Sequence, residues 1–552
     1  MSLLTDPPRR SPRGGLEEVE QEQNGRLPFI LSRTEVKLLG IAGTGFLIDA
    51  YDLFIINQVS VMLQYRLYEG STLPAGLEGF IKAGANIGAV LGQFIFGYLS
   101  DAFGRKAIYG KELMIIIFAT ILCICVPTGA LPASGSLIWI GVSRIILGIG
   151  IGGDYPMSAS VMSDRALIWK RGALLSYIFS NQGYGSLLGS IITLIVLAAY
   201  KSPMDVHGET SKVDGVWRII VGVSLIPAFA TLYQRLTLPE ATRYLKSKHV
   251  EEDTIARIKA DYKKPPPPVL EPENEKGDAE IKATTSAEIQ VQQPGPSENT
   301  SATDLEAGAT TAAPAEESKK AHWKEFAAYF SQWRHMKILI GTCMSWFLLD
   351  VAFYGINLNQ SVVLKQIHFD GKGDITPWHS MFKISTGNLI ITALGFVPGY
   401  WATTLTVEYL GRKWIQMQGF LFASLFLGVL AGKFHDLSTP AFIVCFAFLQ
   451  FFFNFGANTT TYLYPAEVFP TRFRSSAHGL SAAAGKAGAI ISALAFNTLA
   501  KKIGTPAVLW IFFGCCLAGA AFTLLLPEVK GRDPDEVDRM ELAETKRDFV
   551  AA

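Results

Sequence analysis

The sequence predicts an all-α integral membrane protein with twelve transmembrane helices, arranged as two bundles of six. Three observations support this prediction. Hydrophobic residues make up 49% of the 552 residues, and they gather in runs long enough to cross a bilayer. A long polar interval divides these runs into two sets of six. Short motifs recur at matching places in both sets, which indicates an internal repeat.

Apolar runs define the spans, because about twenty helical residues cross the hydrocarbon core of a bilayer. The first six predicted spans are 37–63, 79–100, 108–127, 135–160, 172–200 and 216–238. The second six are 337–364, 379–407, 414–432, 439–465, 475–500 and 506–527.

The segments outside the spans are polar. The N-terminal tail, 1–36, has no apolar stretch typical of a cleaved signal peptide. The linker, 239–336, contains no aromatic residue between Pro265 and Ser318, so we expect it to be largely disordered. Its flank Ala321–Trp333 is predicted to be an amphipathic helix on the membrane surface. The C-terminal tail is 528–552.

The short loops set the orientation. Lys and Arg are denser in the loops 101–112, 163–172, 408–414 and 467–475 than in the loops that face the other side. Cytoplasmic loops carry such an excess. We therefore expect both termini and the linker to be cytoplasmic, with the spans in contact with the lipid bilayer.

Composition excludes several classes of function. The net charge is +1, which gives no reason to expect a nucleic-acid partner. The six cysteines lie in apolar segments without metal-ligand spacing. We find no nucleotide-binding loop and no catalytic-triad pattern, so we expect neither an enzyme nor a cofactor or metal site.

Three motifs recur in the two halves of the chain. Each copy follows the corresponding span, which makes coincidence a poor explanation. A parallel six-plus-six repeat with a site between the halves is typical of transporters. The matched copies are Asp164 and Arg171 with Glu467 and Arg474, Gly104-Arg105-Lys106 with Gly411-Arg412-Lys413, and Pro239-Glu240 with Pro527-Glu528.

The fourth span ends in the glycine-rich stretch 148–163, which contains Asp154 beside Tyr155. A carboxylate within a span costs roughly 2.5–3.5 kcal/mol on insertion scales, and glycines let helices approach closely. The stretch therefore favours a helix that lines a polar cavity. The alternative is a helix end at which Asp154 already lies among lipid headgroups.

The seventh span places Trp346, Asp350 and Tyr354 four residues apart, so they share one helix face. An anion that itself carries hydroxyls would donate to a carboxylate such as Asp350. Lys486, in a small-residue stretch of the eleventh span, needs an anionic partner if it is buried. That partner is a substrate anion, a permanent ion pair with Asp350, or each in turn. A polar clamp between helices is the alternative for the seventh-span face.

Longer motifs resemble known families. Gly97-Tyr-Leu-Ser-Asp101-Ala-Phe-Gly104-Arg105-Lys106 resembles the loop motif of the major facilitator superfamily. The second copy, Gly399 to Arg412, lacks the Asp and is longer. Pro239-Glu-Ala-Thr-Arg243 is similar to a motif of the sugar-porter branch. The following segments resemble the phosphate:H⁺ symporter family, in particular its fungal high-affinity members: Gly152–Ser158, Trp346–Gly355, Asn454–Thr461 and Ser481–Ala489.

The resemblance implies the major facilitator fold, with two six-helix bundles related by a pseudo-two-fold axis. It also implies phosphate contacts from both halves and proton coupling through Asp49 and Asp154. Buried acids of this kind mark proton relays in transporters. From the sequence alone, Arg144 is the expected partner of whichever aspartate it touches. The phosphate contacts that the resemblance assigns are Tyr155, Gln182, Trp346, Asp350, Tyr354, Asn458 and Lys486.

Charged residues also cluster at the predicted cytoplasmic ends of the spans. We interpret them as gating pairs that stabilise the outward-open state and break when the protein opens inward. These residues are Asp101, Arg105, Asp164, Arg171, Glu467 and Arg474.

The sequence thus predicts a monomeric, proton-coupled importer of inorganic phosphate in the plasma membrane. It is expected to work by alternating access, with arsenate as a competitor because the two anions share shape and charge. A sugar or organic-ion porter of the same superfamily is one alternative, although a neutral sugar would not need Lys486. A phosphate-sensing receptor that signals through the linker is the other.

Overall fold

The computed structural model describes residues 27–239, 315–371 and 376–541. These residues contain twelve helical segments long and apolar enough to cross a membrane. The predicted all-α fold with twelve spans is therefore confirmed. The predictions for the two tails and for the middle of the linker concern residues outside the described ranges. In the linker flank the structure has helix α12 (Ala315–Ser331).

Each half of the fold contains six spans, several of which are built from two helices. The first half comprises α2 (Arg33–Phe54), α3 (Ile56–Tyr68), α4 (Ala75–Phe103), α5 (Arg105–Ile108), α6 (Lys111–Ile124), α7 (Ala133–Ser163), α8 (Arg171–Ala199), α9 (Val213–Gly222) and α10 (Leu225–Leu236). The second comprises α13 (Trp333–Asn357), α14 (Ser361–Gln366), α15 (Pro377–Ile391), α16 (Val397–Leu410), α17 (Arg412–Gly432), α18 (Thr439–Asn454), α19 (Ala457–Val468), α20 (Arg474–Ile503) and α21 (Thr505–Thr523).

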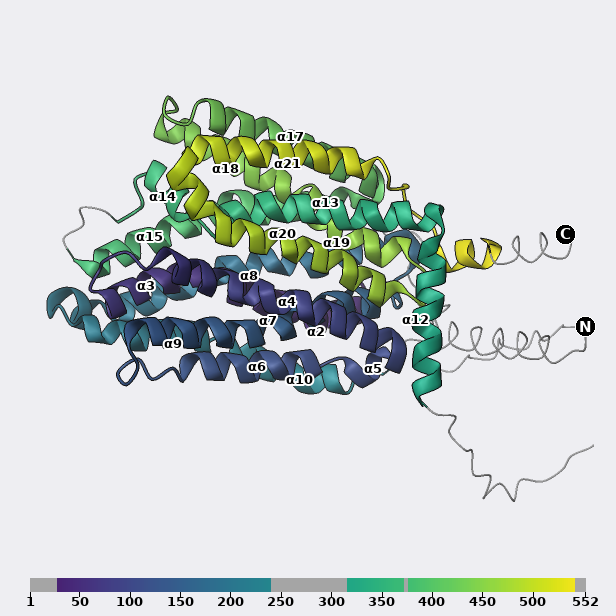
Figure 1. The fold of residues 1–552 in the computed structure, drawn as a ribbon, viewed down its shortest axis with the longest axis horizontal. Helices are drawn as coiled ribbons and strands as arrows, with labels where there is room; N and C mark the ends of the chain where they lie inside the picture. The colour runs from purple at the N-terminus through teal and green to yellow at the C-terminus, as the bar shows by residue number, and fades with distance from the viewer. Residues whose placement is uncertain (1–26, 240–314, 372–375, 542–552) are drawn as a thin grey trace, which may run out of the picture. The chain divides into compact units, whose positions relative to one another are not determined.

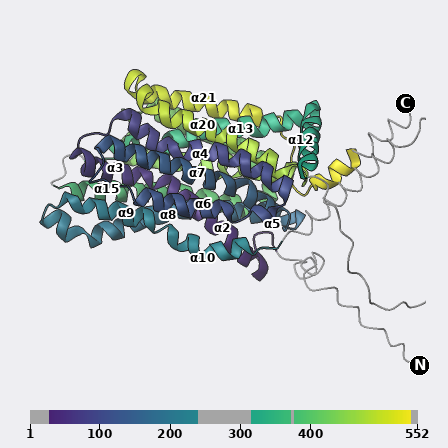
Figure 2. The ribbon, with the colours of Figure 1, turned by 60° about the horizontal axis from the view of Figure 1, so that its bottom comes forward.

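The spans of both halves lie side by side (Figures 1 and 2). Because each half has an even number of spans, it starts and finishes at the same end of the bundle. We call this the terminal end: α2 and α13 begin there, and α10 and α21 finish there. We call the opposite end, where α3 finishes and α14 lies, the loop end.

The two halves meet most extensively along two helix pairs, α4 with α20 and α8 with α16, and α7 and α15 also pack against the opposite half. Within the first half, α4 packs on α7 through glycines. A Cβ added to Gly148 would lie 2.7 Å from the carbonyl carbon of Ala85. Small residues of this kind let helix backbones approach closely in membranes, and here they hold α7 and its stretch 148–163 against α4.

The tenth span is interrupted between α18 and α19. The backbones of Gly456 and Gly419 touch there, so neither position has room for a side chain. Transporters place such breaks in spans beside their substrate sites. The break lies between Asn454 and Asn458, which are both buried, and Asn458 Nδ2 donates across it to Asn454 Oδ1 at 2.7 Å.

We predict that Gly148→Val destabilises the protein, because the new side chain overlaps the backbone of α4. Overpacking of this kind costs about 1–3 kcal/mol. The measurement is the thermal transition of the purified protein in detergent. Gly514→Val is the matched control, since no atom lies within 4 Å of a Cβ at Gly514. Equal transitions for the two variants would contradict the prediction.

Candidate substrate site

Lys486 lies at the centre of the candidate site. The residue is 1% exposed. Nζ donates to Asp350 Oδ2 at 3.2 Å and to the Tyr354 hydroxyl at 2.7 Å. The four-residue spacing along α13 brings Asp350 and Tyr354 to the same side of that helix, as predicted. The ammonium and the carboxylate neutralise each other, which a charge buried in the membrane requires.

Aromatic rings enclose the Lys486 ammonium. Nζ lies 4.2 Å from the ring centre of Tyr354 and 5.2 Å from that of Tyr155. The ring of Trp346 lies 6.3 Å from that of Tyr155. Ring faces attract a cation. Because Tyr155 belongs to α7 and Lys486 to α20, this contact joins the two halves.

A chain of hydrogen bonds continues the site across the halves. Gln182 Nε2 donates to the Tyr155 hydroxyl at 2.5 Å. Asn458 Nδ2 donates to the Tyr400 hydroxyl at 2.8 Å, and that hydroxyl lies 3.5 Å from Gln182 Oε1. The structure thus gathers all seven residues of the predicted phosphate set into one cluster. Tyr400 of α16 is an addition: it lies in the second loop motif, Gly399 to Arg412, to which the sequence assigned no phosphate contact.

Toward the loop end, the cluster is closed by contacts between the halves. The ring of Phe54 stacks on that of Tyr354, with centres 5.9 Å apart, and Asn57 Nδ2 donates to the Asn357 carbonyl at 2.8 Å. Beyond them lies a cavity of about 1070 Å³ lined by both halves, with Lys82 and Asn388 among its residues. Asn57 also lines this cavity, so the cavity reaches the contacts that close the cluster, and we call it the vestibule.

Toward the terminal end, the predicted gating residues form a network across the halves. Asp164 of the first half pairs with Arg474 of the second, and also with Arg105. Arg105 donates to the Thr471 carbonyl at 2.9 Å. Asp101 accepts from the backbone N–H of Ser476 at 2.7 Å. The bond between Arg105 and Asp164 lies within the first half. The others tie the first half to the start of α20 or to the segment just before it.

A second set of contacts mirrors the first with the halves exchanged. Arg412 binds Glu467 at 2.6 Å and Glu408 at 2.7 Å. Glu408 accepts from the backbone N–H of Ala173 at 2.9 Å, and Arg171 acts electrostatically on Glu467. Together the two sets contain all six predicted gating residues. They close the terminal end between the two halves.

Glu408 belongs to the second set of contacts, and the motif comparison missed it. The second loop motif lacks an Asp, but Glu408 precedes Arg412 by four residues, as Asp101 precedes Arg105. The turn between acid and base is also repeated: Gly104 has φ 93° and Gly411 has φ 84°. A search for acidic charge at that spacing, with glycine at the left-handed turn, would have found Glu408.

The first-half carboxylates surround one arginine. Both terminal nitrogens of Arg235 lie 3.0 Å from an oxygen of Asp154, and Nη1 also reaches Glu112 at 3.1 Å. Asp49 is fully buried within electrostatic range of Asp154 and Arg235. Neither of its carboxylate oxygens accepts a hydrogen bond from the described residues.

Arg144, the expected partner of these aspartates, donates instead to the backbone carbonyls of Ile81 at 2.9 Å and Asp52 at 3.0 Å. Arg235 has the place beside Asp154. Arg235 lies near the end of the sixth span, so the sequence suggests a residue at the membrane boundary. Only the packing of α10 against α2 and α6 shows that its side chain reaches the interior.

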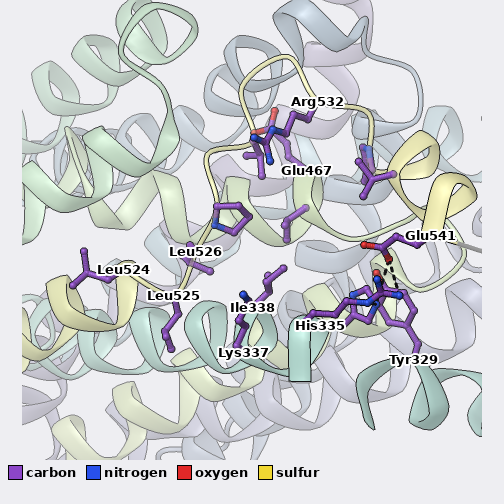
Figure 3. Close-up of a pocket in the computed structure, with 16 residues that line it drawn as sticks. Tyr329, His335, Lys337, Ile338, Glu467, Leu524, Leu525, Leu526, Arg532 and Glu541 are labelled. Atoms are coloured by element: carbon purple, nitrogen blue, oxygen red, sulfur yellow. Dashed lines mark hydrogen bonds and ion pairs between the residues drawn. The ribbon is translucent and has the colours of Figure 1, made fainter. Parts of the chain in front are cut away.

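A separate cavity of about 450 Å³ lies at the terminal end, and it is lined by Tyr329 of α12, by the second half and by the C-terminal segment. Figure 3 shows Glu541 beside His335 there, with Glu541 Oε2 3.4 Å from His335 Nε2. A ligand in this cavity would contact one half only. The cluster around Lys486 is therefore the candidate for a site that both halves share.

The fold and this central site define a membrane transport protein built from two repeated halves. The chain belongs to the family described as "Sugar (and other) transporter", whose model matches residues 38–540. Members of this family are transporters and not enzymes.

Relatives agree with this assignment. The chain is 37% identical to the inorganic phosphate transporter PHO84 of Saccharomyces cerevisiae, over 92% of this chain and 84% of that protein. It is 44% identical to a Schizosaccharomyces pombe protein whose name provisionally assigns it to inorganic phosphate transport, over 96% and 92%. Among solved structures, the proton:xylose symporter XylE of E. coli shares the fold, with a TM-score of 0.66, 19% identity and coverage of 92% and 98%.

We predict that Arg235→Gln strongly destabilises the protein, because it leaves buried carboxylates without their cation. Breaking a buried pair costs about 3–5 kcal/mol. The double variant Arg235→Gln/Asp154→Asn should recover part of the loss. Thermal unfolding of the purified proteins measures both. Arg66→Gln is the control, since its contact with Asp214 is partly exposed and 3.8 Å long. An Arg235 variant as stable as this control would refute the prediction.

Proposed function

We propose that this chain is a proton-coupled importer of inorganic phosphate in the plasma membrane. One observation carries the proposal. A buried ammonium, Lys486, faces a carboxylate, Asp350, inside a cluster of hydrogen-bonding groups that both halves supply. The names of the relatives, which refer to inorganic phosphate, support the same substrate.

Phosphate suits the chemistry of this cluster. Its oxygens accept hydrogen bonds from the Lys486 ammonium and from the amides of Gln182 and Asn458. Its hydroxyls donate to Asp350. The ammonium acts as a point charge toward the anion. If Asp350 instead bound a neutral sugar, the buried Lys486 ammonium would have no anionic partner. This disfavours a sugar porter.

Transport follows from the arrangement of the two ends. The vestibule at the loop end admits phosphate from outside, and the contacts of Phe54 and Asn57 separate before it reaches Lys486. Binding draws the halves together around the anion. The gate pairs at the terminal end, such as Asp164 with Arg474, then break, and phosphate leaves inside. Such rocking around a fixed midplane site is alternating access.

Proton coupling is proposed for the carboxylates around Arg235. One guanidinium faces three carboxyl groups, those of Asp154, Glu112 and Asp49. A buried excess of negative charge is costly, so the cluster is expected to bind protons. Asp49 has no hydrogen-bond donor among the described residues, which makes it the group proposed to load and release the transported proton.

The terminal end is proposed to face the cytoplasm, because the basic loops lie there. A single chain supplies both sides of the central site, so a monomer is sufficient for transport. Arsenate should compete with phosphate, since it has the same tetrahedral shape and charge.

We predict that proteoliposomes containing the protein accumulate radiolabelled phosphate when an inward proton gradient is imposed. Asp350→Asn and Lys486→Gln should each lower the initial rate at least tenfold, because each leaves a buried charge unmatched. Arsenate should inhibit uptake, and Lys433→Gln, an exposed lysine, should have no effect. If the parent protein takes up no phosphate, the proposal is wrong.

We further predict that Asp49→Asn uncouples the protein. Gradient-driven accumulation should be lost, because the amide cannot carry the proton. Exchange of labelled external phosphate for unlabelled internal phosphate should persist, since it needs no net proton movement. Both are measured in the same proteoliposomes, with the exposed Asp436→Asn as control. Accumulation that survives in Asp49→Asn would exclude Asp49 as the coupling group.

A further inference from the structure

Three buried polar side chains lie between the central site and the terminal-end gate, and the proposed mechanism uses none of them. They are Gln93 on α4, Tyr462 on α19 and His478 on α20. All three are fully buried. Among the described residues, no group bonds to either amide atom of Gln93, to the Tyr462 hydroxyl or to His478 Nδ1.

Their position follows from the contacts of α20. His478 precedes Lys486 by eight residues, two turns toward the terminal end. Its ring lies 5.6 Å from that of Trp346 and 5.2 Å from that of Tyr462. One turn further on, the Ser475 hydroxyl already belongs to the gate, where it donates to Ser160 Oγ at 2.7 Å.

Gln93 reaches the same level from the other half. A Cβ on Gly479, the residue after His478, would overlap the backbone carbonyl of Gln93. The helices α4 and α20 are therefore in backbone contact at this point. Gln93 and the residue after His478 therefore lie at one level of the surface that opens when the two halves separate at the terminal end.

The free atoms have the donors and acceptors that phosphate requires. His478 Nε2 lies 3.1 Å from the Tyr462 carbonyl. Because a carbonyl only accepts, Nε2 carries a proton, and Nδ1 of the neutral ring presents a lone pair. The Tyr462 hydroxyl and the Gln93 NH₂ group donate. Phosphate offers oxygens to these donors and a hydroxyl to Nδ1.

Buried polar groups without partners cost free energy, so each needs an explanation. The closed conformation leaves these three unpaired at the interface between the halves. We propose that Gln93, Tyr462 and His478 form an exit site, which binds phosphate transiently after it leaves Lys486 and before it passes the opened gate. This inference rests on the proposed function and extends it to the release step.

The test compares the parent protein with Gln93→Leu, Tyr462→Phe and His478→Phe. Inorganic phosphate is the probe in two measurements: gradient-driven uptake into proteoliposomes, and equilibrium binding to the purified protein in detergent. An exit site predicts a Vmax at least fivefold lower, because release is slowed. It also predicts a KM and an equilibrium Kd within twofold of the parent values, because entry and the central site are intact.

The matched control is Asn86→Leu. Asn86 lies two turns nearer the loop end on the same helix, is equally buried and also has unbonded amide atoms. It should keep the parental Vmax.

Unchanged Vmax in the three variants would overturn the exit site, as would an equal fall in Asn86→Leu. Loss of equilibrium binding in Tyr462→Phe, which removes only a hydroxyl, would place Tyr462 in the central site instead and would also overturn it. Absence of phosphate uptake by the parent protein is a separate result, since it would contradict the proposed function itself.

Discussion

The neutralisation of one buried cation is the constraint on which the rest of the structure depends. An ammonium within a membrane span is tolerated only beside an anion and away from lipid. Asp350 meets this need for Lys486, and the rings of Tyr155 and Tyr354 cover the pair. This requirement places α13 against α20 in the second half and draws α7 of the first half onto the same point. The closures at both ends then keep the pair from water.

Periodicity within single helices made much of this site predictable. The spacing of Trp346, Asp350 and Tyr354 indicated a shared face, and the repeated motifs indicated two equivalent halves. Apolar length alone identified the twelve spans. These features depend only on the geometry of one helix or on the comparison of one segment with another, and both are present in the sequence.

Contacts between helices were harder to predict from the sequence. Arg235 approaches Asp154, and Tyr400 joins Gln182 to Asn458, because of how whole helices rotate and cross one another. No spacing along the chain encodes those rotations. Glu408 was missed for a different reason: the motif was compared by residue identity, whereas the gate requires only a carboxylate four residues before an arginine.

The gate has a further consequence that follows from its exchanged pairs. Asp164 of the first half binds Arg474 of the second, while Arg171 of the first acts on Glu467 of the second. Each half thus offers the same acid and base to the other, as subunits do in an isologous dimer. A chain of only six spans with this acid and base would be able to close the same gate by pairing this surface with that of a second copy in the same membrane orientation, related to it by a two-fold axis. The gate therefore has the symmetry of a homodimer, now held within a single polypeptide.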